Sequence, residues 1–264
     1  MSRFAERMQM VPDILYEDNH LIAVLKPAGL LTQGDISGAP CLLDNIKNYI
    51  RQRDRKPGNV YLGMVQRLDR PVSGVIIFAK TSKAAGRLSS QIRNRQLGKL
   101  YVAVTCSKNS LESMKNRWLE VTDNLSRARD RTIVVGDPGR SSQHGVLRLK
   151  TVYSNEYSSV HLIVLVTGRK HQIRAQLAHR DLPVSGDRKY GSKQSYPLPH
   201  GIGLHAFCCR FEHPVSHEKT IITAPLPDSF SAFFSAAEMD AVKSLLADGI
   251  SEFDGGGSAA TRII

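Results

Sequence analysis

The sequence contains few cysteines and no long apolar run, and both shortages narrow the class of protein. Its 264 residues include four cysteines, none of them in a Cys-x-x-Cys pair, so reduced thiols are expected rather than a disulfide framework. No stretch approaches the roughly eighteen consecutive apolar residues that a membrane span requires. The first residues are polar and lack the apolar segment of a secretory signal. These shortages predict a cytoplasmic protein that has no membrane as its partner.

Three signatures of enzyme chemistry are missing as well. His205 and Cys208 have a spacing seen in metal sites, but no second pair completes a ligand set, so no metal is expected. The chain has no glycine-rich phosphate-binding loop. Ser73 precedes a glycine, yet the Gly-x-Ser-x-Gly pattern of many serine hydrolases is absent. Any chemistry that the protein performs must therefore come from other side chains.

Acidic residues are too few to balance the basic ones. The chain has 36 Lys and Arg against 24 Asp and Glu, a formal net charge of +12, which favours a polyanionic partner. Residues 80–99 contain several basic side chains and no acid, and arginines also gather in 127–140 and 169–188. A charged run is often only a solvated surface. The total charge nevertheless favours a groove that follows a nucleic-acid backbone over a membrane surface, because no basic segment carries an apolar face.

Short apolar runs dominate the expected secondary structure. We expect strands at 14–16, 21–25, 75–79, 100–106, 146–152, 160–166, 206–212 and 220–223, and helices at 40–50, 82–92, 170–179 and 236–246. Pro40 is placed at the first position of the first helix and Thr81 at the N-cap of the second. Residues 107–145 show no clear pattern, and 185–203 are expected to form a long surface loop. Because strands outnumber helices without regular alternation, the pattern predicts an α+β fold.

The loop that precedes the apolar run at 75–79 holds the first candidate site. Here Asp69 has Arg67 two residues before it and Arg70 directly after it. Nearby cations favour the charged form of a carboxyl group, so Asp69 is a candidate nucleophile or base. An aspartate between arginines is also common as a structural ion pair or as an acceptor in a turn. This segment by itself does not decide between these roles.

A second polar cluster lies where an expected strand gives way to a helix. The first turns of that helix contain Arg169, Lys170, His171 and Gln172. The positive end of a helix dipole attracts an anion, either a phosphate or a carboxylate from elsewhere in the chain. Arg169 and Arg174 are five residues apart and do not share a helix face. The alternative is a set of exposed basic residues on an amphipathic helix.

A third candidate is the pair formed by Lys99 and Tyr101. Strand alternation places these two side chains on one face of the strand and Leu100 on the other. An aromatic ring beside a cation suits a stacked base that carries a phosphate. A tyrosine in a strand is also an ordinary part of a core or of its rim.

Taken in order, these segments resemble the RluA family of pseudouridine synthases. The resemblance rests on Arg67-Leu68-Asp69 with Ser73-Gly74, on Lys99-x-Tyr101, and on the run 167–174 followed by Pro183-Val184-x-Gly186-Asp187-x-x-Tyr190-Gly191. Segments 14–18, 26–29, 204–206 and 211–214 match as well. Because the match covers roughly residues 13–227 in the order of the family, it is more specific than any one motif.

The resemblance implies a fold, an activity and a set of site residues. The fold is a mixed α+β domain in which a curved, mixed or antiparallel sheet with flanking helices holds a central RNA-binding cleft. The activity is the isomerisation of uridine to pseudouridine in structured tRNA or rRNA, without cofactor or metal. Asp69 would be the catalytic carboxylate, Tyr101 would pack on the target base, and Arg174 would pair with Asp69. The implied RNA contacts, some of which would alternatively support the site, are Arg67, Arg70, Lys99, Arg169, Lys170, His171 and Gln172.

The same resemblance divides the chain into four parts. These are an N-terminal arm (1–12), a catalytic domain (13–227), a helical extension (228–250) and a flexible tail (251–264). We expect the family's frequent N-terminal RNA-binding module to be absent, because the match begins so close to the first residue. A basic domain of this kind is expected to be a monomer.

Three positions depart from the usual pattern of the family. Gln66 stands where a histidine is usual, Val72 where a threonine is usual, and Asp181 where a glycine is usual. Gln66 and Val72 support an alternative function, that of a catalytically weak or inactive RNA-binding or RNA-folding protein that retains the fold. Hydrolysis of a nucleoside or an ester is disfavoured, since no paired carboxylates are evident. Neither Gln66 nor Val72 replaces the carboxylate, so the sequence favours an active enzyme.

Overall fold

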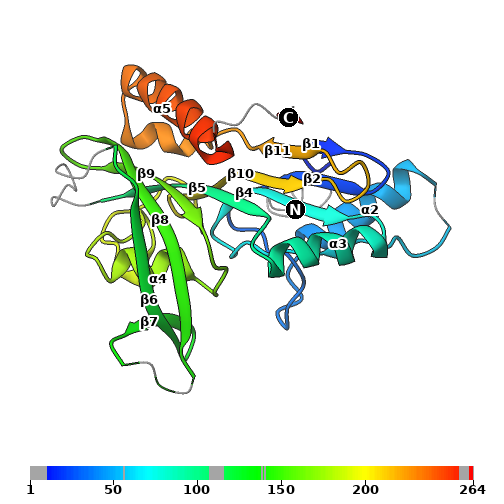
Figure 1. The fold of residues 1–264 in the computed structure, drawn as a ribbon, viewed down its shortest axis with the longest axis horizontal. Coiled ribbons are helices and arrows are strands. Elements are labelled where there is room, and N and C mark those ends of the chain that lie inside the picture. Colours follow the sequence, from blue (N-terminus) through cyan, green and yellow to red (C-terminus); the bar gives the residue numbers. More distant parts are fainter. Residues whose placement is uncertain are drawn as a thin grey trace.

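The computed structural model describes residues 11–55, 57–106, 116–137, 139, 141–255 and 262–263 (Figure 1). The expected N-terminal arm, apart from residues 11 and 12, and the end of the expected tail at 256–261 and 264 lie outside these residues. The elements are β1 (Ile14–Glu17), β2 (Leu21–Lys26), α2 (Leu42–Arg53), β3 (Gly63–Met64), β4 (Ser73–Ala79), α3 (Ser82–Arg93), β5 (Gly98–Thr105), β6 (Leu119–Ala128), β7 (Arg131–Val135), β8 (Gln143–Ser154), β9 (Ser159–Leu165), α4 (Gln172–Ala178), η3 (Arg188–Tyr190), β10 (Leu204–Glu212), β11 (Lys219–Thr223), η4 (Asp228–Phe233), α5 (Ala236–Asp254) and β12 (Arg262–Ile263).

One mixed sheet contains all twelve of the described strands. Its main path runs β1-β2-β4-β10-β5-β9-β8-β6-β7, with β3 paired to β4 and β11 paired to β10. Neighbours on the main path are antiparallel except β4 and β10, which run parallel. Strands β6, β7 and β8 extend away from the half of the sheet formed by β1, β2 and β4 (Figure 1). The expected α+β class with a mixed sheet and flanking helices is confirmed.

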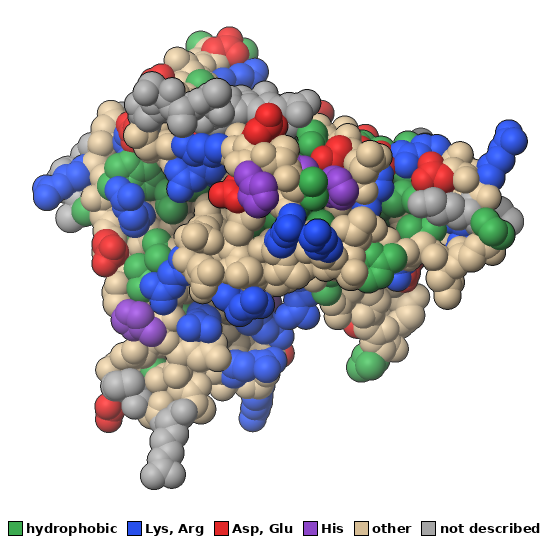
Figure 2. All heavy atoms as spheres, turned by 45° about the vertical axis from the view of Figure 1, so that its right-hand side comes forward, with side chains coloured by type: hydrophobic (Ala, Val, Ile, Leu, Met, Phe, Trp, Pro, Cys, Tyr) green, Lys and Arg blue, Asp and Glu red, His purple; other side chains and the backbone are tan. Residues whose placement is uncertain are grey.

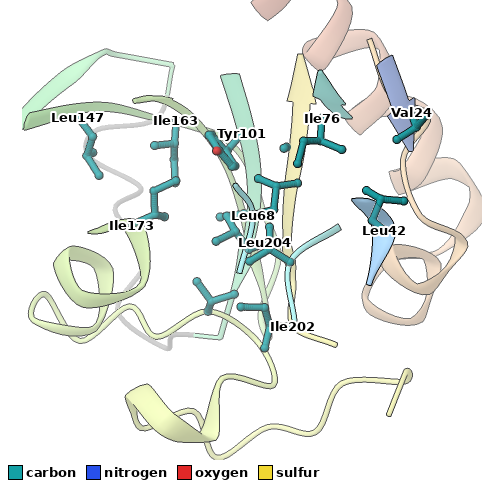
Figure 3. Packing of buried hydrophobic residues seen from close by; sticks show 14 of the residues in the cluster. Val24, Leu42, Leu68, Ile76, Tyr101, Leu147, Ile163, Ile173, Ile202 and Leu204 are labelled. Atoms are coloured by element: carbon teal, nitrogen blue, oxygen red, sulfur yellow. The ribbon is translucent and has the colours of Figure 1, made fainter. Parts of the chain in front are cut away.

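Alternation along the central strand β5 separates two regions of the core. Tyr101 belongs to a cluster with Leu68, Ile163 and Leu204 on one face (Figure 3), whereas Leu100 belongs to the cluster under α5 on the other face. The expected placement of Tyr101 opposite Leu100 is therefore correct. The first face is the one on which polar loops from distant parts of the chain meet.

Two helices begin as their sequence signals predict. Thr81 is the N-cap of α3, and its hydroxyl accepts a hydrogen bond from the backbone N–H of Ala84 at 3.2 Å. Ser235 and Glu238 form a capping box at the start of α5. Helix α5 continues to Asp254, beyond the expected helix end at 246 and into the segment expected as a tail. It does so because apolar residues such as Phe253 continue to face the core.

Three expected boundaries differ in the structure. Helix α2 begins at Leu42 with Cys41 as its N-cap, so Pro40 precedes the helix instead of opening it. Helix α4 begins at Gln172 rather than at residue 170, because His171 has a left-handed backbone with φ of 52°. Residues 185–203 are not simply a surface loop, since Ser185 and Asp187 are buried in it.

The segment without a clear pattern forms a hairpin in the part that the structure describes. Strand β6 pairs with β7 on one side and with β8 on the other. Its fully buried apolar residues are Val121 and Leu125, four positions apart, and most of its other side chains are polar. Because β6 contains so few buried apolar residues, its sequence does not show the alternation of apolar and polar residues that would have predicted a strand.

The close approach of β4 to β10 explains the Ser-Gly pair that follows the Asp69 loop. Gly74 has φ of 124°, and a Cβ atom at this position would lie 2.2 Å from the carbonyl oxygen of Ala206. The hydroxyl of Ser73 lies 2.8 Å from Nδ1 of His205, and both side chains are buried. A glycine and a hydrogen-bonded pair are thus required where the two parallel strands meet.

A second buried histidine lies between two threonines of the sheet. The ring nitrogens of His161 are 2.8 Å from the hydroxyl of Thr105 and 3.0 Å from that of Thr151. Burial lowers the pKa of His161 from 6.5 to about 4, and burial also lowers the pKa of His205 to about 4. Both rings are therefore neutral in the folded protein at pH 7.

The two histidines predict a loss of stability in mild acid. Because their pKa is lower in the folded than in the unfolded chain, their neutral forms stabilise the fold fully above pH 6.5, and this contribution falls as the pH approaches 4. Each should lower the free energy of unfolding by about 2 kcal/mol between pH 7 and pH 5.

Urea unfolding of the wild type and His161→Gln at several pH values measures this effect. The variant should be less stable at pH 7 but should lose about 2 kcal/mol less on going to pH 5, because only His205 then titrates. Parallel pH profiles for the two proteins would contradict the assignment to His161.

Candidate active site

A cavity of about 1200 Å³ lies beside the central strands, where four polar segments of the chain meet. Its walls include 31–35, 64–69, the end of α3, and 165–174. Two carboxylates line it, those of Asp35 and Asp69. The Lys and Arg residues of its lining are Arg67, Arg93, Arg95, Lys99, Arg127, Arg169, Lys170 and Arg174. Figure 2 shows Lys and Arg side chains gathered near the middle of one face. Such a cavity attracts an anionic ligand.

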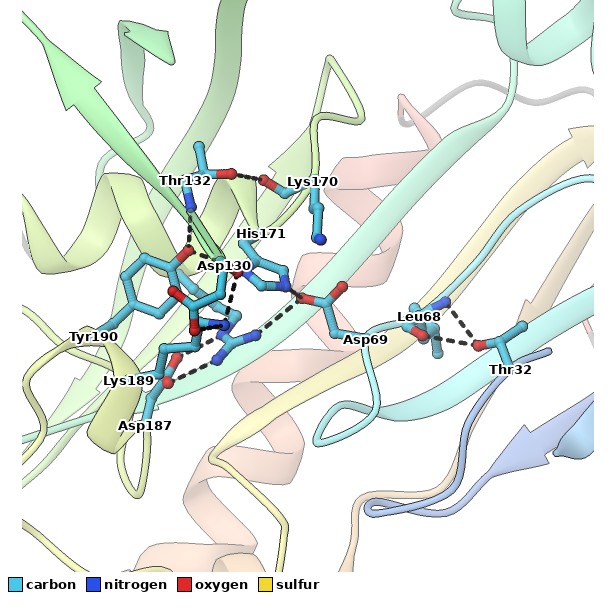
Figure 4. Close-up of polar contacts among 11 residues, drawn as sticks. Thr32, Leu68, Asp69, Asp130, Thr132, Lys170, His171, Asp187, Lys189 and Tyr190 are labelled. Atoms are coloured by element: carbon cyan, nitrogen blue, oxygen red, sulfur yellow. Dashed lines mark hydrogen bonds and ion pairs between the residues drawn. The ribbon is translucent and has the colours of Figure 1, made fainter. Parts of the chain in front are cut away.

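Asp69 lies on the loop that leads into β4, at the wall of this cavity. Its side chain is 28% exposed, so a ligand in the cavity can reach it. Nη1 of Arg174 donates to Oδ2 of Asp69 at 3.2 Å, and Nε2 of His171 lies 3.6 Å from the same oxygen (Figure 4). Within the described part of the chain, Oδ1 has no hydrogen-bond or ion-pair partner. The carboxylate is therefore oriented through one oxygen, while the other is available.

Arg174 is held from behind by a second carboxylate. Its Nε and Nη2 donate to the two carboxylate oxygens of Asp187 at 2.6 and 2.8 Å, and both side chains are almost fully buried. Its guanidinium also lies 4.8 Å from the ring centre of Tyr190. Burial lowers the pKa of Arg174, but Asp187 and Asp69 outweigh this effect and raise it. The arginine thus remains charged and fixed.

His171 stands beside this pair in an uncommon backbone conformation. Its left-handed φ of 52° turns the ring toward Asp69, and its Nδ1 lies 2.9 Å from the hydroxyl of Tyr190. Burial lowers the pKa of His171, although the charge of Asp69 acts in the opposite direction. A neutral imidazole thus adds a polar contact next to Asp69 without adding a second full charge.

The backbone on both sides of Asp69 is anchored to the last residue of β2 and to the segment that follows this strand. The hydroxyl of Thr32 donates to the carbonyl oxygen of Leu68 at 2.8 Å and accepts from its N–H at 3.2 Å. Nζ of Lys26, fully buried, donates to the carbonyl oxygens of Pro27, Leu30 and Arg70 at 2.9, 2.7 and 3.2 Å. Burial lowers the pKa of Lys26 to about 7. Lys26, which belongs to the motif at 26–29, thus holds the backbone next to Asp69 in position.

Tyr101 and Lys99, which strand alternation placed on one face of the strand, both line the same cavity as Asp69. The ring of Tyr101 is only 8% exposed and is packed among apolar residues, and this burial raises the pKa of its hydroxyl. Burial also lowers the pKa of Lys99. The two residues therefore form part of the floor, with little of either side chain in open solvent.

The remaining candidate contacts have three different surroundings. Arg67, Arg169 and Lys170 are exposed and line the cavity. Arg70 is outside the lining, and its Nε donates to the carbonyl oxygen of Gly29 at 2.9 Å. Gln172 is buried: its Oε1 accepts from the hydroxyl of Thr167 and from the backbone N–H of Arg169, and its Nε2 donates to a backbone carbonyl. Because both ends of its amide group are bound within the protein, Gln172 is better suited to support the site than to contact a ligand.

The three departures from the family pattern lie where they leave the Asp69–Arg174 pair intact. Gln66 lines the cavity and contacts Cys209. Val72 is buried in the apolar core. Asp181 has φ of 57°, a left-handed backbone in which glycine is favoured and aspartate is tolerated. The usual glycine at that position thus has a conformational reason.

Several residues of the site were not assigned a role from the sequence. Asp187, Tyr190 and Lys26 were identified only as members of motifs, and Thr32 was not identified. Each one acts through a partner distant in the chain, such as Arg174 or the Asp69 loop.

Across the described ranges, no group of three or more His, Cys, Asp or Glu side chains is arranged to hold a metal ion. Nor does any described helix have the length and apolar character needed to cross a membrane.

Comparison with known proteins identifies related sequences. A family model described as RNA pseudouridylate synthase matches residues 20–179. Ribosomal large subunit pseudouridine synthase C of Buchnera aphidicola (subspecies Baizongia pistaciae) is 34% identical over 221 residues, which cover 81% of this chain and 66% of that protein. Ribosomal large subunit pseudouridine synthase D of Xylella fastidiosa is 34% identical over 248 residues, or 86% and 70% of the two chains. The chain spans about two thirds of the length of these relatives.

Solved structures show the same fold. Human RNA Pseudouridylate Synthase Domain Containing 4 has a TM-score of 0.67 and 23% identity, and the match covers 83% of this chain and 90% of that one. Human RNA Pseudouridylate Synthase Domain Containing 1 has a TM-score of 0.65 and 22% identity, with 91% and 96% covered. This likeness supports the α+β architecture described above.

The buried ion pair between Arg174 and Asp187 predicts an effect on stability that can be measured without a ligand. Asp187→Asn removes one charge of a buried ion pair and leaves the guanidinium incompletely compensated, so the free energy of unfolding should fall by about 3 kcal/mol. Asp130→Asn is the matched control, because Asp130 is exposed and its pair with Lys189 lies at the surface. Its effect should stay below about 1 kcal/mol. Equal effects of the two substitutions in urea unfolding would contradict a stabilising role of the Arg174–Asp187 pair.

Proposed function

Since this chain belongs to the RluA family of RNA pseudouridine synthases, we propose that it isomerises specific uridines of ribosomal RNA, with Asp69 as the catalytic carboxylate. The observation that carries the proposal is the contact of Asp69 with Arg174 at the wall of a cation-lined cavity. Ribosomal RNA is favoured as the substrate because two of the relatives are named as synthases of the large ribosomal subunit. The names of these relatives give no comparable support for tRNA.

The reaction requires a group that acts on the nucleoside without being consumed. The N1–C1′ bond of uridine breaks, the uracil turns, and a C5–C1′ bond forms, while the proton lost from C5 is balanced by one gained at N1. A carboxylate can attack C1′, add to the uracil ring, or take the 2′ proton of the ribose. Oδ1 of Asp69 is the oxygen available for each of these steps, because Arg174 and His171 engage Oδ2.

Tyr101 and the cations of the wall have complementary roles in this proposal. The target uridine must leave its stack to reach Asp69, which costs a few kcal/mol that contacts in the cavity have to offset. Tyr101 offers an aromatic surface beside Asp69 for the everted base. The exposed Arg67, Arg169 and Lys170 are placed to bind phosphates of the RNA. We further propose that the protein acts as a monomer in the cytoplasm.

An RNA-binding protein without catalysis is the alternative, and Gln66 and Val72 are the positions that favour it. Both residues leave the contacts of Asp69 in place, since neither side chain hydrogen-bonds to Arg174, His171 or the Thr32 hydroxyl within the described part of the chain. The carboxylate of Asp69, which keeps its partners and is partly exposed, supports a catalytic function over RNA binding alone.

Asp69→Asn tests the catalytic role directly. The amide keeps the shape of the side chain but is a poor nucleophile and base, so pseudouridine formation should fall by roughly a thousandfold or more. RNA binding should be unchanged or tighter, because a negative charge leaves a positive cavity. The measurement is mapping of pseudouridine in an unmodified ribosomal RNA transcript, with filter binding as the control. Product at the wild-type rate would eliminate Asp69 as the catalyst, and a wild type without product would favour the alternative.

Arg169→Ala tests the phosphate contacts. Removal of one phosphate contact should weaken binding to all RNA sequences and reduce the slope of log K against log salt by about 1. Lys243→Ala on α5 is the matched control, because its exposed side chain lies outside the lining of the cavity. The slope is measured by filter binding across a series of KCl concentrations. Identical slopes for the two variants would remove Arg169 from the RNA-binding surface.

A further inference from the structure

Tyr190 contacts both of the residues that hold Asp69. Its hydroxyl lies 2.9 Å from Nδ1 of His171, and the ring of His171 lies between Tyr190 and Asp69 (Figure 4). The two rings meet edge to face, with centroids 5.8 Å apart. On its other side, the ring centre of Tyr190 is 4.8 Å from Cζ of Arg174. Tyr190 does not line the cavity, so its position indicates a role behind His171 and Arg174 rather than contact with a ligand.

The direction of the hydrogen bond between Tyr190 and His171 follows from the other partner of the hydroxyl. The backbone N–H of Thr132 donates to the Tyr190 oxygen at 2.9 Å. Burial raises the pKa of Tyr190, so the hydroxyl keeps its proton at neutral pH. Within the described part of the chain, the only acceptor at hydrogen-bond distance from this hydroxyl is Nδ1 of His171. Tyr190 therefore donates to Nδ1, which is the nitrogen of the ring without a hydrogen.

The surroundings of His171 keep its ring neutral and agree on the place of its one hydrogen. Burial lowers the pKa of His171, and the charge of Asp69 raises it. Three nearby cations lower it further, namely Arg174, Lys170 and Lys189. A neutral imidazole with Nδ1 as acceptor carries its hydrogen at Nε2, the nitrogen 3.6 Å from Oδ2 of Asp69. The opposite tautomer would turn a lone pair toward the carboxylate, so the contacts on both sides of the ring favour the same tautomer.

The hairpin of β6 and β7 supports this arrangement through one residue of β7. Thr132 is buried, and its hydroxyl donates to the carbonyl oxygen of Lys170 at 2.7 Å. Its backbone N–H binds the hydroxyl of Tyr190. One residue thus holds both the backbone directly before His171 and the side chain that binds its ring. These contacts help to keep His171 in the left-handed conformation, which is uncommon for residues other than glycine.

We propose that Tyr190 is a positioning residue that fixes the tautomer of His171, so that the N–H at Nε2 is directed at Oδ2 of Asp69. The proposal rests on the proposed function and extends it. Hydrogen bonds of a catalytic site are often long without a ligand and shorten in the complex, so we expect the contact of 3.6 Å to shorten when RNA binds. An N–H from a neutral ring orients Oδ2 without adding a full charge that would weaken Oδ1 as a nucleophile or base.

Tyr190→Phe tests this role because it removes the hydroxyl and keeps the ring beside Arg174. The substrate is an unmodified ribosomal RNA transcript, followed under single-turnover conditions. The rate of pseudouridine formation at saturating enzyme should fall by about tenfold or more, since Oδ2 loses an oriented partner. The enzyme concentration at half-maximal rate should stay within about twofold of the wild type, because Tyr190 does not line the cavity. Tyr196→Phe is the matched control: its hydroxyl lies 2.6 Å from that of Ser229, outside the lining of the catalytic cavity, and its rate should stay within about twofold.

A double-mutant cycle separates a role through His171 from a general loss of structure. His171→Asn suits the left-handed backbone, and its side chain is too short to replace Nε2 beside Asp69. If Tyr190 acts through Nε2, adding Tyr190→Phe to His171→Asn should lower the rate by less than about twofold further. The full loss of Tyr190→Phe in this background would show that the tyrosine acts by another route and would overturn the proposal.

The tautomer itself is measured on the protein without RNA. In wild type with isotope-labelled histidine at about pH 8, long-range proton–nitrogen correlations should show His171 with its hydrogen at Nε2. The signal is assigned by its loss in His171→Asn. Tyr190→Phe should lower the share of this tautomer, whereas Tyr196→Phe should leave it unchanged. A hydrogen at Nδ1 in the wild type, or an unchanged His171 signal in Tyr190→Phe, would overturn the proposal.

Failure of this proposal and failure of the proposed function give different results. Equal rates for Tyr190→Phe and the wild type would overturn the positioning role and leave the proposed function standing. A wild type that forms no pseudouridine in any transcript would overturn both.

Discussion

The guanidinium of Arg174 is the group on which the geometry of this site depends. A buried charge is costly unless partners within the protein compensate it. Asp187 supplies two short hydrogen bonds of 2.6 and 2.8 Å, whereas Asp69 receives one longer bond of 3.2 Å. Because the stronger pair satisfies most of the guanidinium, Asp69 is oriented through one oxygen and keeps the other for a ligand. The segment that carries Asp187 therefore lies against α4. This contact places the motif after residue 182 at the site.

The loop of Asp69 is rigid because its backbone is anchored on both sides of the carboxylate. Thr32 holds Leu68 through two hydrogen bonds, and the ammonium group of Lys26 holds the carbonyl oxygen of Arg70. A site that must place one oxygen against one atom of a flexible polymer benefits from such support, since a loose carboxylate loses orientation. The anchors come from the end of β2 and from the segment that follows it, so these residues and the Asp69 loop form one hydrogen-bonded unit.

Continuous apolar runs allowed the sequence to predict β2 and β4, because strands buried on both faces have no other reason to be so apolar. The proximity of Asp69 and Arg174 followed only from the order of the family's motifs. The sequence did not predict the β6–β7 hairpin, whose strands carry few apolar anchors. Nor did it show that Nε of Arg70 donates to the carbonyl oxygen of Gly29. Such contacts depend on which distant carbonyl or carboxylate the fold brings near, and local patterns do not contain that information.

The floor and the rim of the cavity are under different physical constraints. The floor contains the buried Arg174–Asp187 pair and Tyr101, in which a change of one group leaves another uncompensated. The rim includes the exposed side chains of Arg67, Arg169 and Lys170. Phosphate contacts carry no information about base sequence, so positive charge alone cannot select one uridine among many. Recognition of one uridine therefore requires, besides charge, a rim whose shape fits the RNA and a base whose unstacking costs little.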